Sequence, residues 1–115
     1  MRGTELTERA LCKAAIEMES GLIDADLGGC VVKKRVALPG RGKRGGVRTL
    51  VATNRGDRWF FLYGFAKSDR ENITAPELDE LKSVAADLLA RLPHELGALI
   101  LSGALTEICR NGQSP

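Results

Sequence analysis

The first element that the hydrophobic pattern predicts is an amphipathic helix over residues 7–20. Apolar residues recur there every three or four positions, which places them on one face of a helix. Thr7 can cap the first turn, because its hydroxyl accepts from a backbone N–H that has no partner inside the helix. Gly21 is a natural end point, since glycine enters the left-handed conformation without a Cβ clash.

The last third of the sequence is also predicted to be helical. Residues 74–93 carry the clearest apolar stripe at helical spacing. Thr74 and Glu77 form a capping-box signature at its start, with a proline in the first turn, where its missing N–H costs nothing. A second, short helix over residues 94–102 is expected to end at Gly103. The longer helix should pack its stripe on a sheet.

Between these helices the pattern changes to β-branched and aromatic runs, which are typical of strands. Three strands are predicted, over residues 30–38, 47–53 and 58–67. The last two flank residues 54–57, an Asn-Arg-Gly-Asp sequence that favours a hairpin turn. All five aromatic residues lie in the third strand and make both of its faces apolar. We therefore expect this strand to be central in the sheet.

The order of these elements predicts an α+β fold in one domain. It comprises a small twisted antiparallel sheet of three or four strands, with an N-terminal helix and C-terminal helices. The 115 residues suit a single domain, 1–115, of which we expect residues 1–6 and 111–115 to be frayed. The longest apolar run, residues 59–66, is far shorter than the roughly 20 residues of a membrane span. No secretory leader is recognisable, so we expect no membrane association.

The charge is small overall but very uneven along the chain. The formal net charge is +2, yet the window from Cys30 to Gly56 holds eight basic residues and no acidic one. The rest of the chain carries nine basic and fifteen acidic groups, so the formal charge is +8 in this segment and −6 in the remaining residues. Such a block favours a polyanion partner. The alternative is a solvated basic face that aids solubility, and charge alone leaves both open.

Cysteine and histidine are too sparse for the chemistry that they usually support. Cys12, Cys30 and Cys109 lie far apart, and His94 is the only histidine. An odd number of cysteines without metal-ligand spacing argues against a disulfide framework and against a zinc site. We therefore expect that the protein binds no metal ion and no cofactor, and that it resides in a reducing cytoplasm.

Residues 39–46 combine four glycines with three cations. The stretch lacks the spacing of a nucleotide P-loop. Glycines let backbone N–H groups approach an anion closely, and the cations add charge. We expect a loop here between the first two strands.

Residues 21–29, 33–37, 39–48 and 63–74 together carry a family signature. Its most specific parts are Lys-Arg-Gly-Gly-Val-Arg and Tyr-Gly-Phe-Ala-Lys, at this separation. They closely resemble the RelE-type toxins of type II toxin–antitoxin systems, and more narrowly the RelE/HigB-like branch, over residues 8–108. The resemblance implies a small twisted antiparallel sheet with helices on one side. It also implies a toxin that inhibits translation by cutting mRNA on the ribosome, held in check by an antitoxin.

Two features of that branch differ here. Its members usually begin with an extra strand and a longer first helix, which come before the segment that matches Leu11. Residues 1–6 here do not resemble that strand. We therefore expect an open sheet edge, through which the chain can pair with another copy or with an antitoxin. The ribosome-dependent members also place a tyrosine near the position of Thr74. Tyr63 lies on the strand itself and is a candidate base-stacking residue rather than a direct substitute.

The expected site gathers cations that can cut RNA without a metal. No histidine falls in it, so arginine and lysine must stabilise the negative charge on phosphorus. Arg48 and Lys67 are expected at the hairpin end opposite the turn, with Arg70 nearby, and these three are the catalytic candidates. The RNA-binding candidates are Lys33, Lys34, Arg35, Arg41, Lys43 and Arg44. For each of them the alternative is a solvated surface cation.

The resemblance thus predicts a cytoplasmic, ribosome-dependent mRNA endoribonuclease. Its expected partners are the ribosome, mRNA and a cognate antitoxin of helix-turn-helix type. One alternative is a non-enzymatic ParE-type toxin that binds DNA gyrase, and another is an inactive truncated toxin that only binds its antitoxin. Converging cations favour cleavage, because a gyrase binder does not need them.

Overall fold

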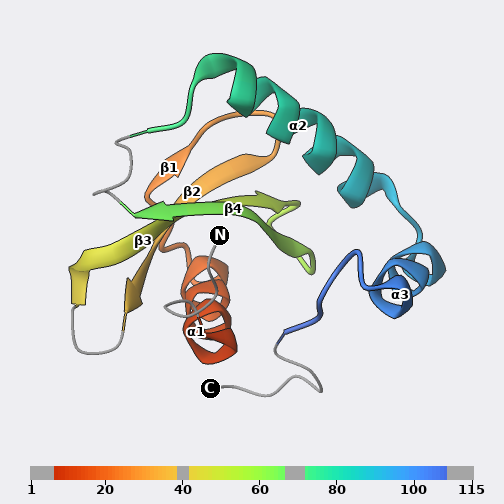
Figure 1. Ribbon diagram of the computed structural model, residues 1–115, viewed down its shortest axis with the longest axis horizontal. Coiled ribbons are helices and arrows are strands. Elements are labelled where there is room, and N and C mark those ends of the chain that lie inside the picture. The colour runs from red at the N-terminus through yellow and green to blue at the C-terminus, as the bar shows by residue number, and fades with distance from the viewer. Residues whose placement is uncertain (1–6, 39–41, 67–71, 109–115) are drawn as a thin grey trace.

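A four-stranded antiparallel sheet with helices against both faces organises the protein (Figure 1). The computed structural model describes residues 7–38, 42–66 and 72–108. The strand order β1-β2-β3-β4 follows the chain, as expected of a meander. The elements are α1 (Glu8–Glu19), β1 (Ala25–Asp26), β2 (Val31–Leu38), β3 (Gly42–Thr53), β4 (Trp59–Ala66), α2 (Ala75–Ala90) and α3 (Pro93–Ser102). The predicted α+β fold class is confirmed.

Local capping signals place the helices where the sequence predicts them. The Thr7 hydroxyl accepts from the Ala10 N–H at 3.0 Å. At α2, the Thr74 hydroxyl accepts from the Glu77 N–H, and the Glu77 carboxylate accepts from the Thr74 N–H at 2.9 Å. α3 ends at Gly103, whose φ of +86° is left-handed. Within the described ranges, no helix is both long and apolar enough to cross a membrane.

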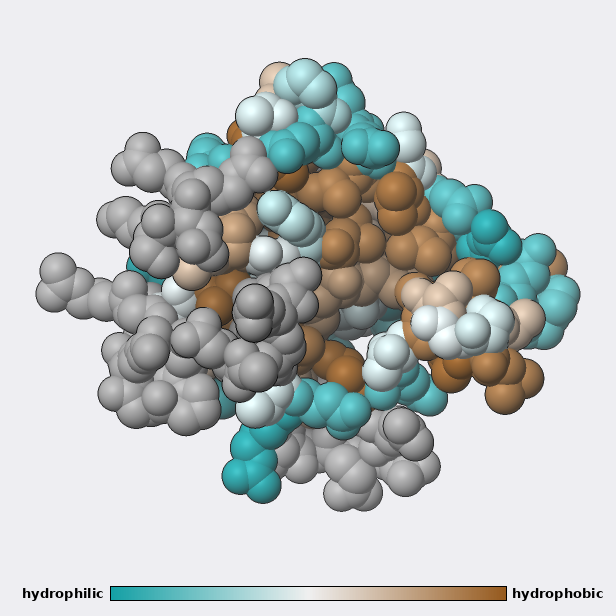
Figure 2. All heavy atoms as spheres, in the orientation of Figure 1, coloured by the Kyte–Doolittle hydropathy of each residue, from teal (hydrophilic) through white to brown (hydrophobic). Residues whose placement is uncertain are grey.

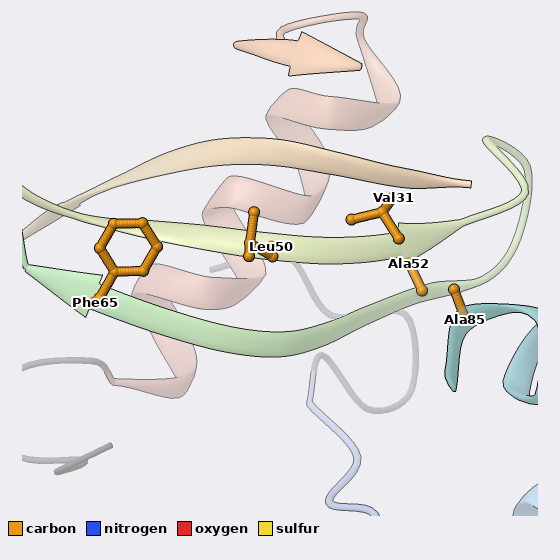
Figure 3. Packing of buried hydrophobic residues seen from close by; sticks show 5 residues of the cluster. All are labelled: Val31, Leu50, Ala52, Phe65 and Ala85. Carbon is orange, nitrogen blue, oxygen red and sulfur yellow. The ribbon is translucent and has the colours of Figure 1, made fainter. Parts of the chain in front are cut away.

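The two central strands are buried on both faces, and neighbouring residues belong to different cores. Val31 packs on the side of α2, whereas Val32 packs on the side of α1, because successive side chains of a strand alternate. The buried residues of the α2 side are Val31, Leu50, Ala52, Phe65 and Ala85 (Figure 3). Those of the α1 side are Met18, Val32 and Val51. The helices therefore cover opposite faces of the sheet, which corrects the expectation that they lie on one side.

β4 is an edge strand, so the expectation of a central position is wrong. Among the described residues it pairs with β3 alone. Trp59 and Phe61 contact the α1 core, while Phe60 and Leu62 contact the α2 core. Apolar residues on both faces of a strand thus indicate that both faces are covered. They carry no information about whether both edges are paired.

Two strand boundaries also differ from the sequence prediction. β3 begins at Gly42, so most of the glycine-rich stretch is strand rather than loop. An irregularity between Val36 and Leu38 shifts the register, so that Leu38 stands opposite Gly42. β1 lies in the segment that the sequence predicts as a connection, because two residues are too few to form a recognisable pattern.

The cysteines behave differently from what their number predicts. Cys12 is buried in α1 and is disulfide-bonded, whereas Cys30 is a free, exposed thiol. The expectation of no disulfide is therefore wrong for Cys12. Pairing depends on which parts of the chain meet in the fold, and the cysteine spacing does not encode that.

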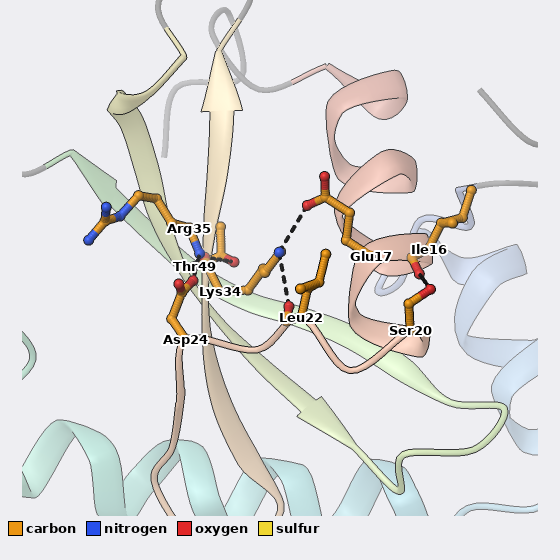
Figure 4. Close-up of polar contacts among 8 residues, drawn as sticks. All are labelled: Ile16, Glu17, Ser20, Leu22, Asp24, Lys34, Arg35 and Thr49. Carbon is orange, nitrogen blue, oxygen red and sulfur yellow. Dashed lines mark hydrogen bonds and ion pairs between the residues drawn. The ribbon is translucent and has the colours of Figure 1, made fainter.

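A buried lysine joins α1 to the sheet. The side chain of Lys34 is only 2% exposed, and its ammonium lies 2.9 Å from the Glu17 carboxylate (Figure 4). The ammonium also donates to the carbonyl of Leu22 at 2.9 Å. On the same face of the sheet, the Thr49 hydroxyl donates to the Lys34 carbonyl at 2.8 Å. These bonds hold the helix, the connection that follows it, and the two central strands together.

The Lys34→Met variant tests this connection. It keeps most of the side-chain volume but removes the ammonium from Glu17 and Leu22, so we expect the free energy of unfolding to fall by about 2 kcal/mol. Urea unfolding measures the change. Lys33→Met is the matched control, because Lys33 lies on the other face and is partly exposed, and it should change stability by less than about 0.5 kcal/mol. Equal effects of the two substitutions would contradict the role of Lys34.

Candidate nucleic-acid interface

Three candidate cations lie on the α2 side of the sheet. Arg35 on β2 and Arg48 on β3 stand directly opposite each other, and Lys33 stands opposite Leu50 on the same face. Because side chains alternate along a strand, these three lie on the same face of the sheet. The side chain of Lys34, between Lys33 and Arg35 on β2, points to the opposite face (Figure 4). All three are partly exposed. We call Lys33, Arg35 and Arg48 the cation face.

The cation face places like charges on opposed positions. Two cations directly opposite on neighbouring strands repel each other. Among the described residues, none of the three cations takes part in an ion pair. Asp24 is near Arg35, but its carboxylate accepts from the backbone N–H of Arg35. A phosphate between the guanidinium groups would relieve this repulsion and receive charge-assisted hydrogen bonds.

An exposed aromatic ring borders the cation face. On β4, Phe65 stands opposite Arg48 and Tyr63 stands opposite Leu50. Phe65 is buried, whereas Tyr63 is 39% exposed, and the two ring centroids are 5.9 Å apart with tilted planes. The buried ring therefore supports the exposed one, and an exposed ring beside cations can stack on a nucleobase.

A β-bulge decides the side on which Tyr63 lies. The β3–β4 register shifts between Leu50 and Val51, so Phe61 stands opposite Val51 and Tyr63 opposite Leu50. Without the extra residue, Leu62, Tyr63 would stand opposite Thr49 on the α1 side. Sequence analysis could not place Tyr63 at the site, because nothing in the alternation of β4 signals the bulge.

The structure places the other site candidates unevenly. Arg48 lies in the middle of β3, and not at its start as the sequence suggests. Lys43 and Arg44 also belong to β3, but their side chains lie outside the described part. Lys67 follows Ala66, which pairs with Val47 beside Arg48. Outside the described residues lie Arg41, Lys67 and Arg70.

Lys34 does not belong with the RNA-binding candidates. A contact with an RNA phosphate needs an accessible ammonium, and that of Lys34 is buried against Glu17 and Leu22. The RNA-binding prediction for Lys34 is therefore wrong. Its sequence neighbours Lys33 and Arg35 are partly exposed cations, but strand alternation turns the Lys34 side chain to the opposite face of the sheet. Its role is to anchor α1 to the sheet.

Comparison with protein families identifies the chain at family level. The model of the RelE toxin of the RelE/RelB toxin–antitoxin system matches residues 1–108. The chain belongs to the RelE toxin family. No curated protein and no solved structure matches it significantly. The match includes every residue of the cation face and of its aromatic border, and membership of the RelE family implies an antitoxin partner.

The described part of this RelE-family chain has no group of three or more histidine, cysteine or acidic residues arranged to hold a metal ion. The cation face and its aromatic border present guanidinium, ammonium and phenol groups. These groups bind phosphate oxygens and stabilise negative charge that develops on them.

The opposed charges predict a gain in stability when one of them is removed. Arg48→Gln eliminates the repulsion with Arg35 and keeps much of the side-chain volume. The free energy of unfolding should therefore rise by about 0.5 kcal/mol at low ionic strength. Urea unfolding at low and high salt tests this, since screening should abolish the gain. The control Arg9→Gln changes an exposed cation of α1 and should have no effect. A loss of stability in Arg48→Gln at low salt would show that Arg48 stabilises the fold.

Proposed function

We propose that this RelE-family toxin is a metal-independent endoribonuclease that cuts mRNA on the ribosome in the cytoplasm. The observation that carries the proposal is the opposed pair Arg35 and Arg48, which have no ion-pair partners among the described residues and lie beside the exposed ring of Tyr63. A site that binds one phosphodiester and its adjacent base needs cations for the phosphate oxygens and an exposed ring for the base. Family membership supports a toxin, and the cation face supports RNA as its substrate.

The proposed reaction uses the ribose 2′-hydroxyl as nucleophile. Its oxygen attacks the neighbouring phosphorus, the bond from phosphorus to the 5′-oxygen breaks, and the products are a 2′,3′-cyclic phosphate and a 5′-hydroxyl. The proton leaves the 2′-oxygen, and the departing 5′-oxygen gains one. Arg48 and Arg35 bind the two non-bridging oxygens, whose negative charge increases in the transition state.

The remaining residues position the RNA or complete the site. Lys33 binds a neighbouring phosphate, and Tyr63 stacks on a base next to the bond that breaks. Lys67 is the proposed proton-transfer group, because the basic neighbours expected around it would favour its neutral form. Arg70 is proposed to add charge at the same end of the hairpin. Along the β2–β3 hairpin, phosphate contacts are proposed for Arg41, Lys43 and Arg44.

Substitution of the proposed catalytic cations should separate cleavage from folding. Arg48→Ala and Lys67→Ala should each slow cleavage of mRNA on purified ribosomes by on the order of 100-fold, because a preorganised charge is lost at the transition state. Circular dichroism should show an intact fold. Arg9→Ala, which removes an exposed charge from α1, should cleave like the parent. A parent that inhibits gyrase supercoiling and never cuts mRNA would replace the proposal by a ParE-type function, and full activity in Arg48→Ala would remove Arg48 from the site.

Tyr63 provides an independent test of base stacking. Tyr63→Ala should weaken binding of a short single-stranded RNA by on the order of tenfold, whereas Tyr63→Phe should bind like the parent, because both rings stack. Fluorescence anisotropy measures the affinity. Across the salt series the parent should show a linear fall in log affinity, since bound cations release counterions from phosphates. Weak binding by Tyr63→Phe would assign the role to the hydroxyl group instead.

A further inference from the structure

After α3, the described chain turns back toward α1 (Figure 1). Residues 104–108, which we call the tail, line a groove of about 780 Å³ together with Glu8 and Leu11 of α1. Trp59 of β4 and Ile100 of α3 line the same groove. Figure 2 shows hydrophobic residues on both sides of the hollow, below α2 and on α3. The tail thus forms part of the wall of an apolar groove that it shares with α1.

The hydrogen bonds of this region attach the tail to α3. Within the described ranges, the backbone N–H groups of Gly103 and Leu105 donate to the carbonyls of Ile100 and Leu99, both at 3.1 Å. None of the residues of α3 is buried. An element with little buried apolar surface opens locally at a small cost in free energy. A further attachment of the tail to α1 would therefore decide how often α3 and the tail leave the groove.

The three cysteines of the chain differ in state. Cys12 of α1 is disulfide-bonded and only 5% exposed. Cys30 is a free, exposed thiol. The remaining cysteine, Cys109, lies outside the described residues. Since Cys30 is free, Cys109 is the one cysteine of the chain left to pair with Cys12.

The described residues next to these two cysteines line the same groove. Glu8, Leu11 and Cys12 are three and four positions apart, so they share one face of α1, and the first two line the groove. Ile108 of the tail also lines it, and Cys109 is the next residue in the sequence. A disulfide needs Cα atoms within roughly 7 Å of each other. The meeting of the tail with this face of α1 favours such a separation.

We propose that Cys12 and Cys109 form a redox-controlled latch. The oxidised latch holds the tail and α3 against the groove, and the reduced latch releases them. A dithiol opens it by thiol–disulfide exchange: one thiolate attacks a sulfur of the disulfide, the S–S bond breaks, and the second thiolate completes the disulfide of the reductant. Two electrons pass to the protein, and each cysteine sulfur takes up one proton. A small-molecule disulfide closes the latch by the reverse exchange.

The cellular location decides whether this disulfide acts as a switch. In a reducing cytoplasm, disulfides are usually transient and are catalytic or redox-sensing. The latch would then be open under ordinary conditions and would close on oxidation. This regulatory role rests on the proposed cytoplasmic location, whereas the pairing of Cys12 with Cys109 does not.

The groove and the cation face are separate surfaces. Trp59 stands opposite Thr53 at the turn end of β4, whereas Phe65 stands opposite Arg48 toward the other end. The strand rise puts roughly 15 Å between the two regions. The latch is measured without RNA, so its failure is distinguishable from failure of the proposed cleavage.

Peptide mapping tests the pairing. Trypsin places the three cysteines in different peptides, residues 10–13, 14–33 and 92–110. After oxidation of the full chain with glutathione disulfide, mass spectrometry without reductant should find residues 10–13 joined to residues 92–110, with residues 14–33 linked to neither. A link between residues 10–13 and 14–33, or dimers joined by a disulfide, would overturn the pairing.

The rim of the groove decides which probe can report its opening. Glu8, Asp57 and Glu107 line the groove. The Asn54 amide donates to Asp57 and lowers the pKa of that carboxyl, so the rim carries negative charge at neutral pH. An anionic quencher would be repelled there. Neutral acrylamide is therefore the probe, and Trp59, the only tryptophan of the chain, is the reporter.

Reduction should open the groove and expose Trp59. Dithiothreitol should raise acrylamide quenching of the oxidised protein by about twofold or more and shift the emission to longer wavelength, because water and acrylamide reach the indole once the tail leaves. Cys109→Ser should be quenched like the reduced parent even after oxidation. Cys30→Ser is the matched control, and it should respond to dithiothreitol like the parent.

Circular dichroism separates a local latch from a staple of the whole fold. The described core clusters contain no residue of α3 or of the tail, so the sheet and its cores should persist after reduction. Unchanged quenching on reduction, or an equal response of Cys30→Ser and Cys109→Ser, would overturn the latch. Loss of the folded signal on reduction would overturn it as well, because the disulfide would then be required by the entire fold.

Discussion

Burial of β2 and β3 on both faces is the constraint on which the rest of this structure depends. A strand covered on both sides must send each residue into one of two different environments. Val31 therefore packs with α2 and Val32 with α1, and the same alternation separates Lys33 from Lys34. Lys34 becomes an anchor inside the protein, and its neighbour Lys33 joins the cation face. A shift of one residue in register would exchange these roles, so packing of the two cores fixes the site as firmly as it fixes the fold.

The cation face shows how such a site is maintained against its own repulsion. Arg35 and Arg48 are opposed and have no ion pair among the described residues, which is unfavourable in the free protein. The strands nevertheless stay paired, because they bury apolar residues on both sides, Val31, Leu50 and Ala52 toward α2 and Val32 and Val51 toward α1. Stability provided by the cores thus permits a preorganised cluster of positive charge. A bound phosphodiester would use that charge without having to reorganise it.

The β3–β4 hairpin carries two surfaces of opposite character. Near Phe65 it supports cations and an exposed tyrosine, and near Trp59 it borders an apolar groove with an acidic rim. The bulge at Leu62 lies between these regions and reverses the side on which the following residues point. The two surfaces differ in chemistry, because one offers guanidinium and ammonium groups and the other offers apolar side chains beside carboxylates. Placing them at opposite ends of one hairpin lets a single small sheet support both.

The sequence by itself determined the features that depend on local interactions. The caps at Thr7 and Thr74 and the end at Gly103 involve residues within a few positions of one another, so the helices could be located from the sequence. The meander and the basic segment were also evident. Only the tertiary structure decided that β4 is an edge strand, that Lys34 is buried and that Tyr63 joins the cation face. Each of these depends on which side of a strand faces which helix, or on which edge is paired. Contacts between distant segments settle those questions, and the order of residues along one strand does not encode them.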